Sequence, residues 1–188
     1  EKFGAAPALL EAIPGRGEKR WQAHSWIEYK RAAEEIAAGL LRLGVNKGDV
    51  VALDSETRLE FYLADLGAMT CGGIAAALYT SYPVAEHVKT LRTLEPKAVF
   101  VENPKVLGAL LSNADPPLET TWILLSGEDG GSAVTLAQLR ESGRAALAEN
   151  PHLLAGRVKP EDSAILYLTS GATGEPKTAY RYAPLSPS

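Results

Sequence analysis

The sequence has 188 residues, of which 46% are hydrophobic and 22% charged, as expected for a globular domain with a sizeable core. Its formal net charge of -4, without a long basic block, argues against nucleic acid as the main partner. The single cysteine, Cys71, excludes a disulfide framework or a cysteine zinc site within one chain and fits a reducing cytosol.

Hydropathy gives no sign of a membrane span. No apolar run approaches the ~20 residues that cross a bilayer, so we expect no transmembrane segment and a cytoplasmic location. No signal peptide is visible, but the chain opens at Glu1 without a methionine, so the sequence leaves targeting open.

The elements expected along the chain alternate between helices and short apolar strands. Residues 7–20 are predicted to form a loop, and Ser25 to Glu28 form a capping box that opens a helix ending at Gly44. Two later polar stretches, 126–132 and 150–161, are also predicted loops. In chain order, the remaining helices are expected at about 58–71, from Ser81 and Pro83 to 94, from Asn103 and Pro104 to 111, and from Leu136 to about 149 with an interruption at Gly143.

Short apolar runs predict the strands. They cover residues 49–53, 73–78, 97–101, 121–125 and 164–168. The first four begin 24 residues apart, are apolar throughout and have helical patterns between them. This alternation predicts an α/β fold with βαβ units and a mostly parallel sheet that is covered on both faces.

The segment 166–178 is the most informative stretch of the chain. It reads Leu-Tyr-Leu-Thr-Ser-Gly-Ala-Thr-Gly-Glu-Pro-Lys-Thr. Glycines let backbone amides approach a ligand, hydroxyls add hydrogen-bond donors, and a lysine adds positive charge. Together these are the requirements of a loop that wraps a polyphosphate. The residues that supply them are Thr169, Ser170, Gly171, Thr173, Gly174 and Lys177.

Two common glycine motifs do not fit this segment. A P-loop needs glycine directly before its lysine, where Pro176 stands, and a nucleophile elbow needs glycine where Leu168 stands. The segment instead resembles the phosphate-binding signature of the adenylate-forming superfamily, Thr-Ser-Gly-Thr/Ser-Thr-Gly-x-Pro-Lys-Gly. The superfamily includes acyl-CoA synthetases, luciferases and peptide-synthetase adenylation domains. The matching residues are Thr169, Ser170, Gly171, Thr173, Gly174, Pro176 and Lys177.

Two positions of the segment depart from the signature. Ala172 stands where a hydroxyl residue is usual, which removes one donor to phosphate from the predicted site. Thr178 stands where glycine is usual, which stiffens the turn after the lysine.

The resemblance extends over almost the whole chain up to Lys177. Residues 25–53 resemble the opening of these enzymes, and residues 78–83, Leu-Tyr-Thr-Ser-Tyr-Pro, are similar to the long-chain acyl-CoA synthetase branch. The resemblance implies that residues 1–188 are a single, partial N-terminal adenylation domain. The tail 180–188 contains two prolines, so we expect it to lack regular structure and to be disordered.

The resemblance also implies a two-step reaction. A carboxylate attacks the α-phosphate of ATP to give an acyl-adenylate and pyrophosphate, and the thiol of coenzyme A then displaces AMP. Hydroxyls, amides and one lysine are suited to stabilise the charge of the departing pyrophosphate. In this interpretation Thr169, Ser170 and Thr173 hold the β- and γ-phosphates. Gly171 and Gly174 allow the loop to close and offer N–H groups, while Lys177 anchors by charge.

The resemblance implies that the rest of such a site lies outside this chain. Residues that stack on adenine, hold ribose, bind magnesium or position the acyl group come later in the family. So does a C-terminal domain with a catalytic lysine, for which Lys177 is not a match. We therefore expect no catalytic residue and no metal ligand here. The partners expected are ATP or pyrophosphate, with fatty acid and coenzyme A for a full-length enzyme, which is expected in the cytoplasm or associated with membranes.

Two further functions stay open. The chain is alternatively a non-catalytic nucleotide- or pyrophosphate-binding remnant, a hypothesis motivated by Ala172, Thr178 and the unfamiliar last residues, or it belongs to another acid-activating branch that adenylates aryl or amino acids. A structural or interaction domain whose glycine loop binds nothing is a third hypothesis.

Other polar and aromatic residues are given structural interpretations. His24, His87 and His152 show no metal-ligand spacing and are predicted to lie on surfaces or helix faces. Glu34 and Glu35 are adjacent and form no acid/base pair. Tyr79 lies at a strand end, and we interpret it as a residue that packs in the core rather than one that contacts a ligand. The three tryptophans, Trp21, Trp26 and Trp122, are expected to pack in the interior.

The last strand predicted, at 164–168, bears on self-association. If the sheet is part of a larger one, that strand exposes an unpaired edge, which favours self-association.

Overall fold

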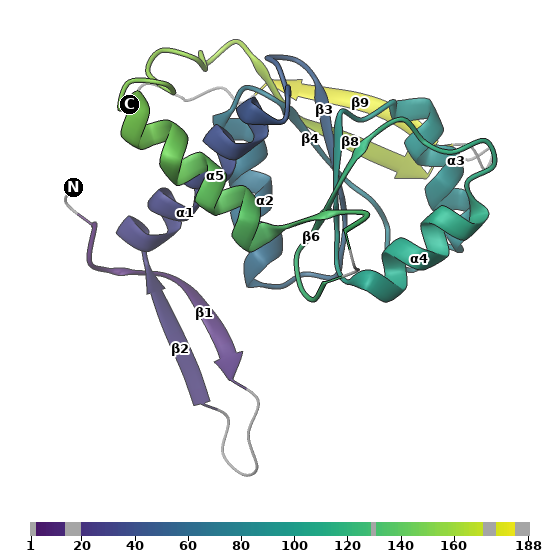
Figure 1. The fold of residues 1–188 in the computed structure, drawn as a ribbon, viewed down its shortest axis with the longest axis horizontal. Helices are drawn as coiled ribbons and strands as arrows, with labels where there is room; N and C mark the ends of the chain where they lie inside the picture. The colour runs from purple at the N-terminus through teal and green to yellow at the C-terminus, as the bar shows by residue number, and fades with distance from the viewer. Residues whose placement is uncertain (1–2, 14–19, 129–130, 171–175, 183–188) are drawn as a thin grey trace.

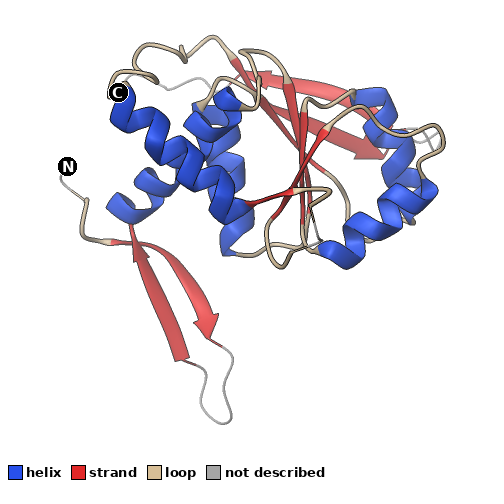
Figure 2. Ribbon diagram, in the orientation of Figure 1, coloured by secondary structure: helices blue, strands red, loops and turns tan. Residues whose placement is uncertain are grey.

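The computed structural model describes residues 3–13, 20–128, 131–170 and 176–182. In these ranges the chain forms five helices, a seven-stranded sheet and a separate two-stranded hairpin (Figures 1 and 2). The helices are α1 (Trp26–Arg42), α2 (Leu59–Thr70), α3 (Val84–Leu94), α4 (Pro104–Asn113) and α5 (Leu136–Glu149). The strands of the large sheet are β3 (Val50–Asp54), β4 (Ile74–Ala77), β5 (Ala98–Val101), β6 (Thr121–Leu124), β7 (Val134–Thr135), β8 (Ser163–Ser170) and β9 (Pro176–Tyr182).

The large sheet confirms the predicted α/β class. Its strand order is β7-β6-β5-β3-β4-β8-β9, and every neighbouring pair is parallel except β8 and β9. Each of the five apolar runs overlaps one of these strands. The sequence did not predict the short edge strand β7 or the antiparallel strand β9.

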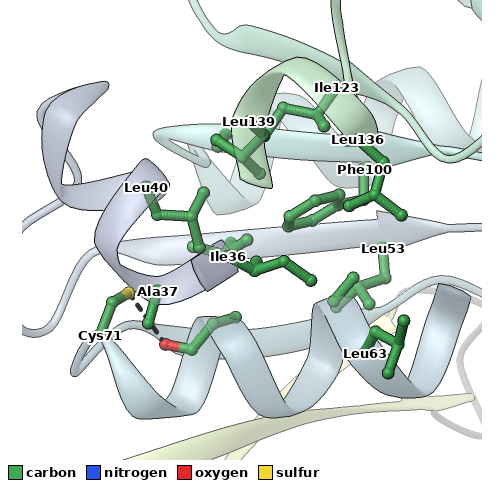
Figure 3. Close-up of a cluster of buried hydrophobic side chains, with 14 of the residues drawn as sticks. Ile36, Ala37, Leu40, Leu53, Leu63, Cys71, Phe100, Ile123, Leu136 and Leu139 are labelled. Carbon is green, nitrogen blue, oxygen red and sulfur yellow. Dashed lines mark hydrogen bonds between the residues drawn. The ribbon is translucent and has the colours of Figure 1, made fainter. Parts of the chain in front are cut away.

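The two faces of the sheet bury separate cores, because side chains alternate along each strand. On β5, Phe100 lies in the core covered by α1, α2 and α5, while Val99 and Val101 lie in the core covered by α3 and α4. Figure 1 shows the two helical layers on opposite sides of the strands. Figure 3 shows the first core, where Phe100 lies among aliphatic side chains from α1, α2, α5 and neighbouring strands. Both faces of the parallel strands are therefore covered, as their apolar runs predict.

Helix capping follows the sequence closely. Ser25 caps α1, with its hydroxyl accepting from the Glu28 amide at 3.3 Å and its own amide donating to the Glu28 carboxylate at 2.7 Å. Asn103 caps α4 by accepting from the amides of Lys105 and Val106. These caps satisfy amides that the first turn of a helix leaves without partners, and so fix where each helix begins.

The predicted interruption at Gly143 is wrong, because α5 is continuous through it. Gly143 lies where α5 crosses α1 closely, and a Cβ built there would lie 1.7 Å from the backbone oxygen of Glu35. Glu35 is itself buried and accepts from Arg140 and Arg144 of α5. The glycine therefore allows close packing of the two helices rather than ending one of them.

The predicted loop over residues 7–20 is also wrong at both ends. Strand β1 (Pro7–Ile13) pairs antiparallel with β2 (Arg20–Ser25), and this hairpin extends away from the helices in Figure 1. Leu10 and Ile13 are exposed on this hairpin, and Trp21 retains 57% of its accessible surface. Trp26 is 49% exposed, so of the three tryptophans only Trp122 is buried as expected.

The tail prediction is wrong for its first three residues. Strand β9 continues to Tyr182, since its backbone pairs with β8 along the whole strand. The remainder of the tail, 183–188, lies outside the described residues.

Candidate phosphate-binding site

The predicted phosphate motif spans the end of β8 and the start of β9. Thr169 and Ser170 are the last two residues of β8, and Lys177 is the second residue of β9. The strand register pairs Thr169 with Lys177 and Ser170 with Pro176. The structure thus brings the backbone of Thr169 next to that of Lys177. Gly171, Ala172, Thr173 and Gly174 lie outside the described residues.

The end of β8 lies at the carboxyl edge of the parallel sheet. Strands β3, β4 and β5 run in the same direction as β8, so their carboxyl ends meet at the same edge. In open α/β sheets, ligands bind in the crevice outside this edge. The described ends of the motif, Thr169 and Ser170, therefore lie at the edge where open α/β sheets usually bind ligands.

A buried ion pair lies at the same edge, and the sequence did not reveal it. Asp54 ends β3 with 2% of its surface exposed, and its carboxylate lies 2.9 Å from Nδ1 of His87, in the first turns of α3. His87 was predicted to lie on the surface or on a helix face. It lies on a face of α3, but it is only 7% exposed, so the surface position is wrong. The available signal was periodicity, because His87 shares the buried face of α3 with Leu91 and Leu94.

The second nitrogen of His87 contacts the connection that follows β4. Nε2 lies 3.0 Å from the carbonyl oxygen of Tyr79, which can only accept, so Nε2 carries a proton. When the carboxylate of Asp54 is ionised, Nδ1 must also donate, and the ring is then an imidazolium. The hydrogen bond to Asp54 accordingly raises the pKa of His87, against the opposing effect of burial.

Tyr79 continues this contact to the phosphate motif. Its hydroxyl donates to the carbonyl oxygen of Leu168 at 2.8 Å, and its ring packs on Tyr82 with 5.5 Å between centroids. Tyr79 is 49% exposed, so its interpretation as a core residue is wrong. A chain of contacts therefore runs from β3 through α3 to the residue that precedes Thr169.

A second polar group lies further along the same edge, beside the hairpin. Glu102 follows β5 and accepts from the Glu56 amide at 2.9 Å, while the hydroxyl of Ser126 donates to the Glu102 carbonyl at 2.7 Å. Arg58 precedes α2 and pairs with Glu60 at 2.6 Å. Of these residues, Glu56, Arg58 and Glu102 border a cleft of about 500 Å³ between β1 and the start of α2. Within the described ranges, no group of three or more His, Cys, Asp or Glu side chains is placed to hold a metal.

A family model matches most of the chain. The model of the family described as AMP-binding enzyme matches residues 1–181. The chain belongs to the AMP-binding enzyme family. The family resemblance that the motif carries is thereby confirmed.

A curated relative of this AMP-binding chain is the long-chain-fatty-acid–CoA ligase ACSBG2 of Rattus norvegicus. It is 25% identical over 186 residues, and the match covers 94% of this chain and 27% of that protein. The AMP-binding chain thus spans about a quarter of the length of this relative.

Solved structures share the fold of this AMP-binding chain. The adenylation domain of a carboxylate reductase from Mycobacterium chelonae superposes with a TM-score of 0.73 at 20% identity, over 97% of this chain and 33% of that one. ATP-bound MatB from Rhodopseudomonas palustris superposes with a TM-score of 0.67 at 23% identity, over 95% of this chain and 32% of that one. The sheet described above is therefore the N-terminal part of an adenylate-forming fold. In the part of the chain that the structure describes, no helix is both long and apolar enough to span a bilayer.

Proposed function

We propose that this chain is the amino-terminal part of an ATP-dependent fatty acid–CoA ligase, and that residues 169–177 bind the phosphates of ATP. The observation that carries the proposal is the position of the motif. Residues that match the adenylate-forming signature stand at the carboxyl end of β8, inside a chain that the AMP-binding family covers. The choice of fatty acid over other acids is supported by the relative ACSBG2, whose name gives a long-chain fatty acid as substrate.

The chemistry of the motif suits the first half of the reaction. As a carboxylate attacks the α-phosphate, negative charge accumulates on the leaving pyrophosphate. Hydroxyls of Thr169, Ser170 and Thr173 would donate to its oxygens, and Lys177 would add charge from the adjacent strand. Gly171 and Gly174 would offer backbone N–H groups, while Ala172 contributes only its own. Coenzyme A would enter the second step as co-substrate.

Magnesium has no proposed ligand in this chain. ATP normally carries the ion into such a reaction, and residues outside this chain would complete its coordination. The proposal therefore assigns to this chain the contacts with phosphate and no step of metal chemistry.

The experiment is ATP–pyrophosphate exchange by the full-length protein with magnesium and a long-chain fatty acid. Exchange that depends on the fatty acid would support the proposal. Lys177→Gln should reduce exchange sharply, whereas Lys30→Gln, an exposed lysine paired with Glu34 on α1, should not. Exchange only with aryl or amino acids would assign the protein to another acid-activating branch. No exchange together with retained pyrophosphate binding would favour the remnant, which Ala172 and Thr178 motivate.

A further inference from the structure

Three residues outside the motif connect the buried end of β3 to the end of β8. Asp54 binds Nδ1 of His87, Nε2 of His87 binds the carbonyl of Tyr79, and the Tyr79 hydroxyl binds the carbonyl of Leu168. The three contacts measure 2.9, 3.0 and 2.8 Å, so each is a hydrogen bond of ordinary length. They come from β3, from α3 and from the connection that follows β4. The end of β8 is thereby tied to two further elements.

Stability alone does not explain why a carboxylate ends β3. The four residues before it are all apolar, as expected for a strand covered on both faces: Val50, Val51, Ala52 and Leu53. Placing a charged pair at such a buried position carries a desolvation cost, and well-packed apolar residues in its place are often as stable. Asp54 and His87 therefore point to a need for fixed position beyond stability alone.

The position that they fix is that of Tyr79. His87 holds the Tyr79 carbonyl, and the Leu78 amide before it donates to the Leu53 carbonyl at 2.9 Å. The connection after β4 is thus held on two sides. The backbones of β4 and β8 pair at Ala75 and Ile165. The Tyr79 side chain contacts β8 further toward its carboxyl end than this pair. Its hydroxyl acts on Leu168, the residue directly before Thr169.

We propose that Asp54, His87 and Tyr79 form a positioning unit that holds the carboxyl end of β8, and with it Thr169 and Ser170, in place for the phosphates of ATP. The inference rests on the proposed function of the motif. None of the three residues needs to touch the nucleotide. They act through the backbone of Leu168, which makes them positioning residues rather than catalytic ones.

The kinetic test uses Tyr79→Phe in the full-length protein, because this change removes the hydroxyl and keeps the ring beside Tyr82. We expect the KM for ATP in pyrophosphate exchange to rise about fivefold, as loss of one hydrogen bond implies, with the KM for fatty acid unchanged. Tyr82→Phe is the matched control and should leave both constants near their wild-type values. An unchanged KM for ATP in Tyr79→Phe would overturn the inference.

His87 offers a rescue test. His87→Ala removes both contacts, whereas His87→Gln keeps an amide donor that can reach the Tyr79 carbonyl. We expect His87→Ala to raise the KM for ATP as Tyr79→Phe does, and His87→Gln to restore much of the loss. In the double variant Tyr79→Phe/His87→Ala, the KM for ATP should rise by less than the product of the two single-variant fold-changes, since both substitutions act on one contact. Multiplicative effects would mean that the residues do not form a unit.

Hydrogen exchange separates this inference from the proposed function. In the free protein, Tyr79→Phe should speed amide exchange in peptides covering 163–170, while Tyr82→Phe should not. If the wild-type protein shows no ATP–pyrophosphate exchange with any acid, the proposed function fails, yet this comparison still decides whether Tyr79 holds the end of β8. Equal amide exchange in the two variants would refute the positioning role.

Discussion

The close crossing of α1 and α5 gives the sharpest test of the packing. In Gly143→Ala, the new Cβ would lie 1.7 Å from the Glu35 oxygen, 2.7 Å from the Glu35 carbonyl carbon and 2.8 Å from the Gly39 nitrogen. All three are backbone atoms of α1, so no side chain can rotate out of the way. The distance from the new Cβ to the Glu35 oxygen must grow by about 1.7 Å before the contact becomes an ordinary van der Waals contact.

Two effects set the size of the loss. Forcing a methyl into a well-packed core costs about 1–3 kcal/mol, and here the separation also loosens Leu139, which packs against Gly39. The buried carboxylate of Glu35 would then lose contact with Arg140 and Arg144, which adds to the cost. Alanine offsets about 1 kcal/mol because it favours a helix more than glycine does. We expect Gly143→Ala to lower the free energy of unfolding by about 2–3 kcal/mol.

The measurement is urea unfolding, with Gly108→Ala as the matched control. Gly108 lies within α4, and a Cβ built there meets nothing within 4 Å. The control should therefore keep or gain stability, by up to about 1 kcal/mol. If Gly143→Ala were as stable as Gly108→Ala, the close approach of α1 and α5 would be refuted.

Three further predictions concern a cap, a histidine and a sheet edge. Asn103→Ala removes the acceptor for two amides of α4 and should lower the unfolding free energy by about 1 kcal/mol in the same urea titration. Because the hydrogen bond to Asp54 raises the pKa of His87, the pair stabilises the fold fully below about pH 6.5 and loses this contribution as the pH rises through the raised value. The stability difference between wild type and His87→Gln should therefore shrink toward alkaline pH, and a difference that grows would contradict the assigned charge. Strand β9 is an edge strand of the large sheet, and an unpaired edge favours association between copies. We therefore expect concentration-dependent association in sedimentation velocity, and a single monomeric species at every concentration would contradict this.

Local patterns predicted the elements whose physics is local. The strand β5 is apolar throughout because both faces of the sheet are covered, and Ser25 and Asn103 cap helices through contacts that span only a few residues. Such signals stand in the sequence itself. Gly143 was misread because its role depends on Glu35 of another helix, more than a hundred positions away, which no local pattern contains.

The hairpin of β1 and β2 escaped prediction for a different reason. Its strands carry no buried face, since Leu10 and Trp21 are exposed, so the alternation of apolar and polar residues that marks a half-covered strand is weak. Proline and glycine between the strands then favoured a loop. These strands are held largely by backbone pairing, which leaves little trace in side-chain composition.

The candidate site also has a part that is local in sequence and a part that is not, and this difference bears on how the site works. The motif at 169–177 is contiguous, so seven residues at fixed spacing were readable from the sequence, whereas Asp54, His87 and Tyr79 lie on separate elements. Ordering the donors of a site on a ligand costs conformational entropy. Residues that fix strand β8, which carries Thr169 and Ser170, in advance reduce that cost without touching the ligand. The geometry at Leu168 supplies such a fixed point, and the buried charge at Asp54 has a purpose that neither local propensity nor stability would give it.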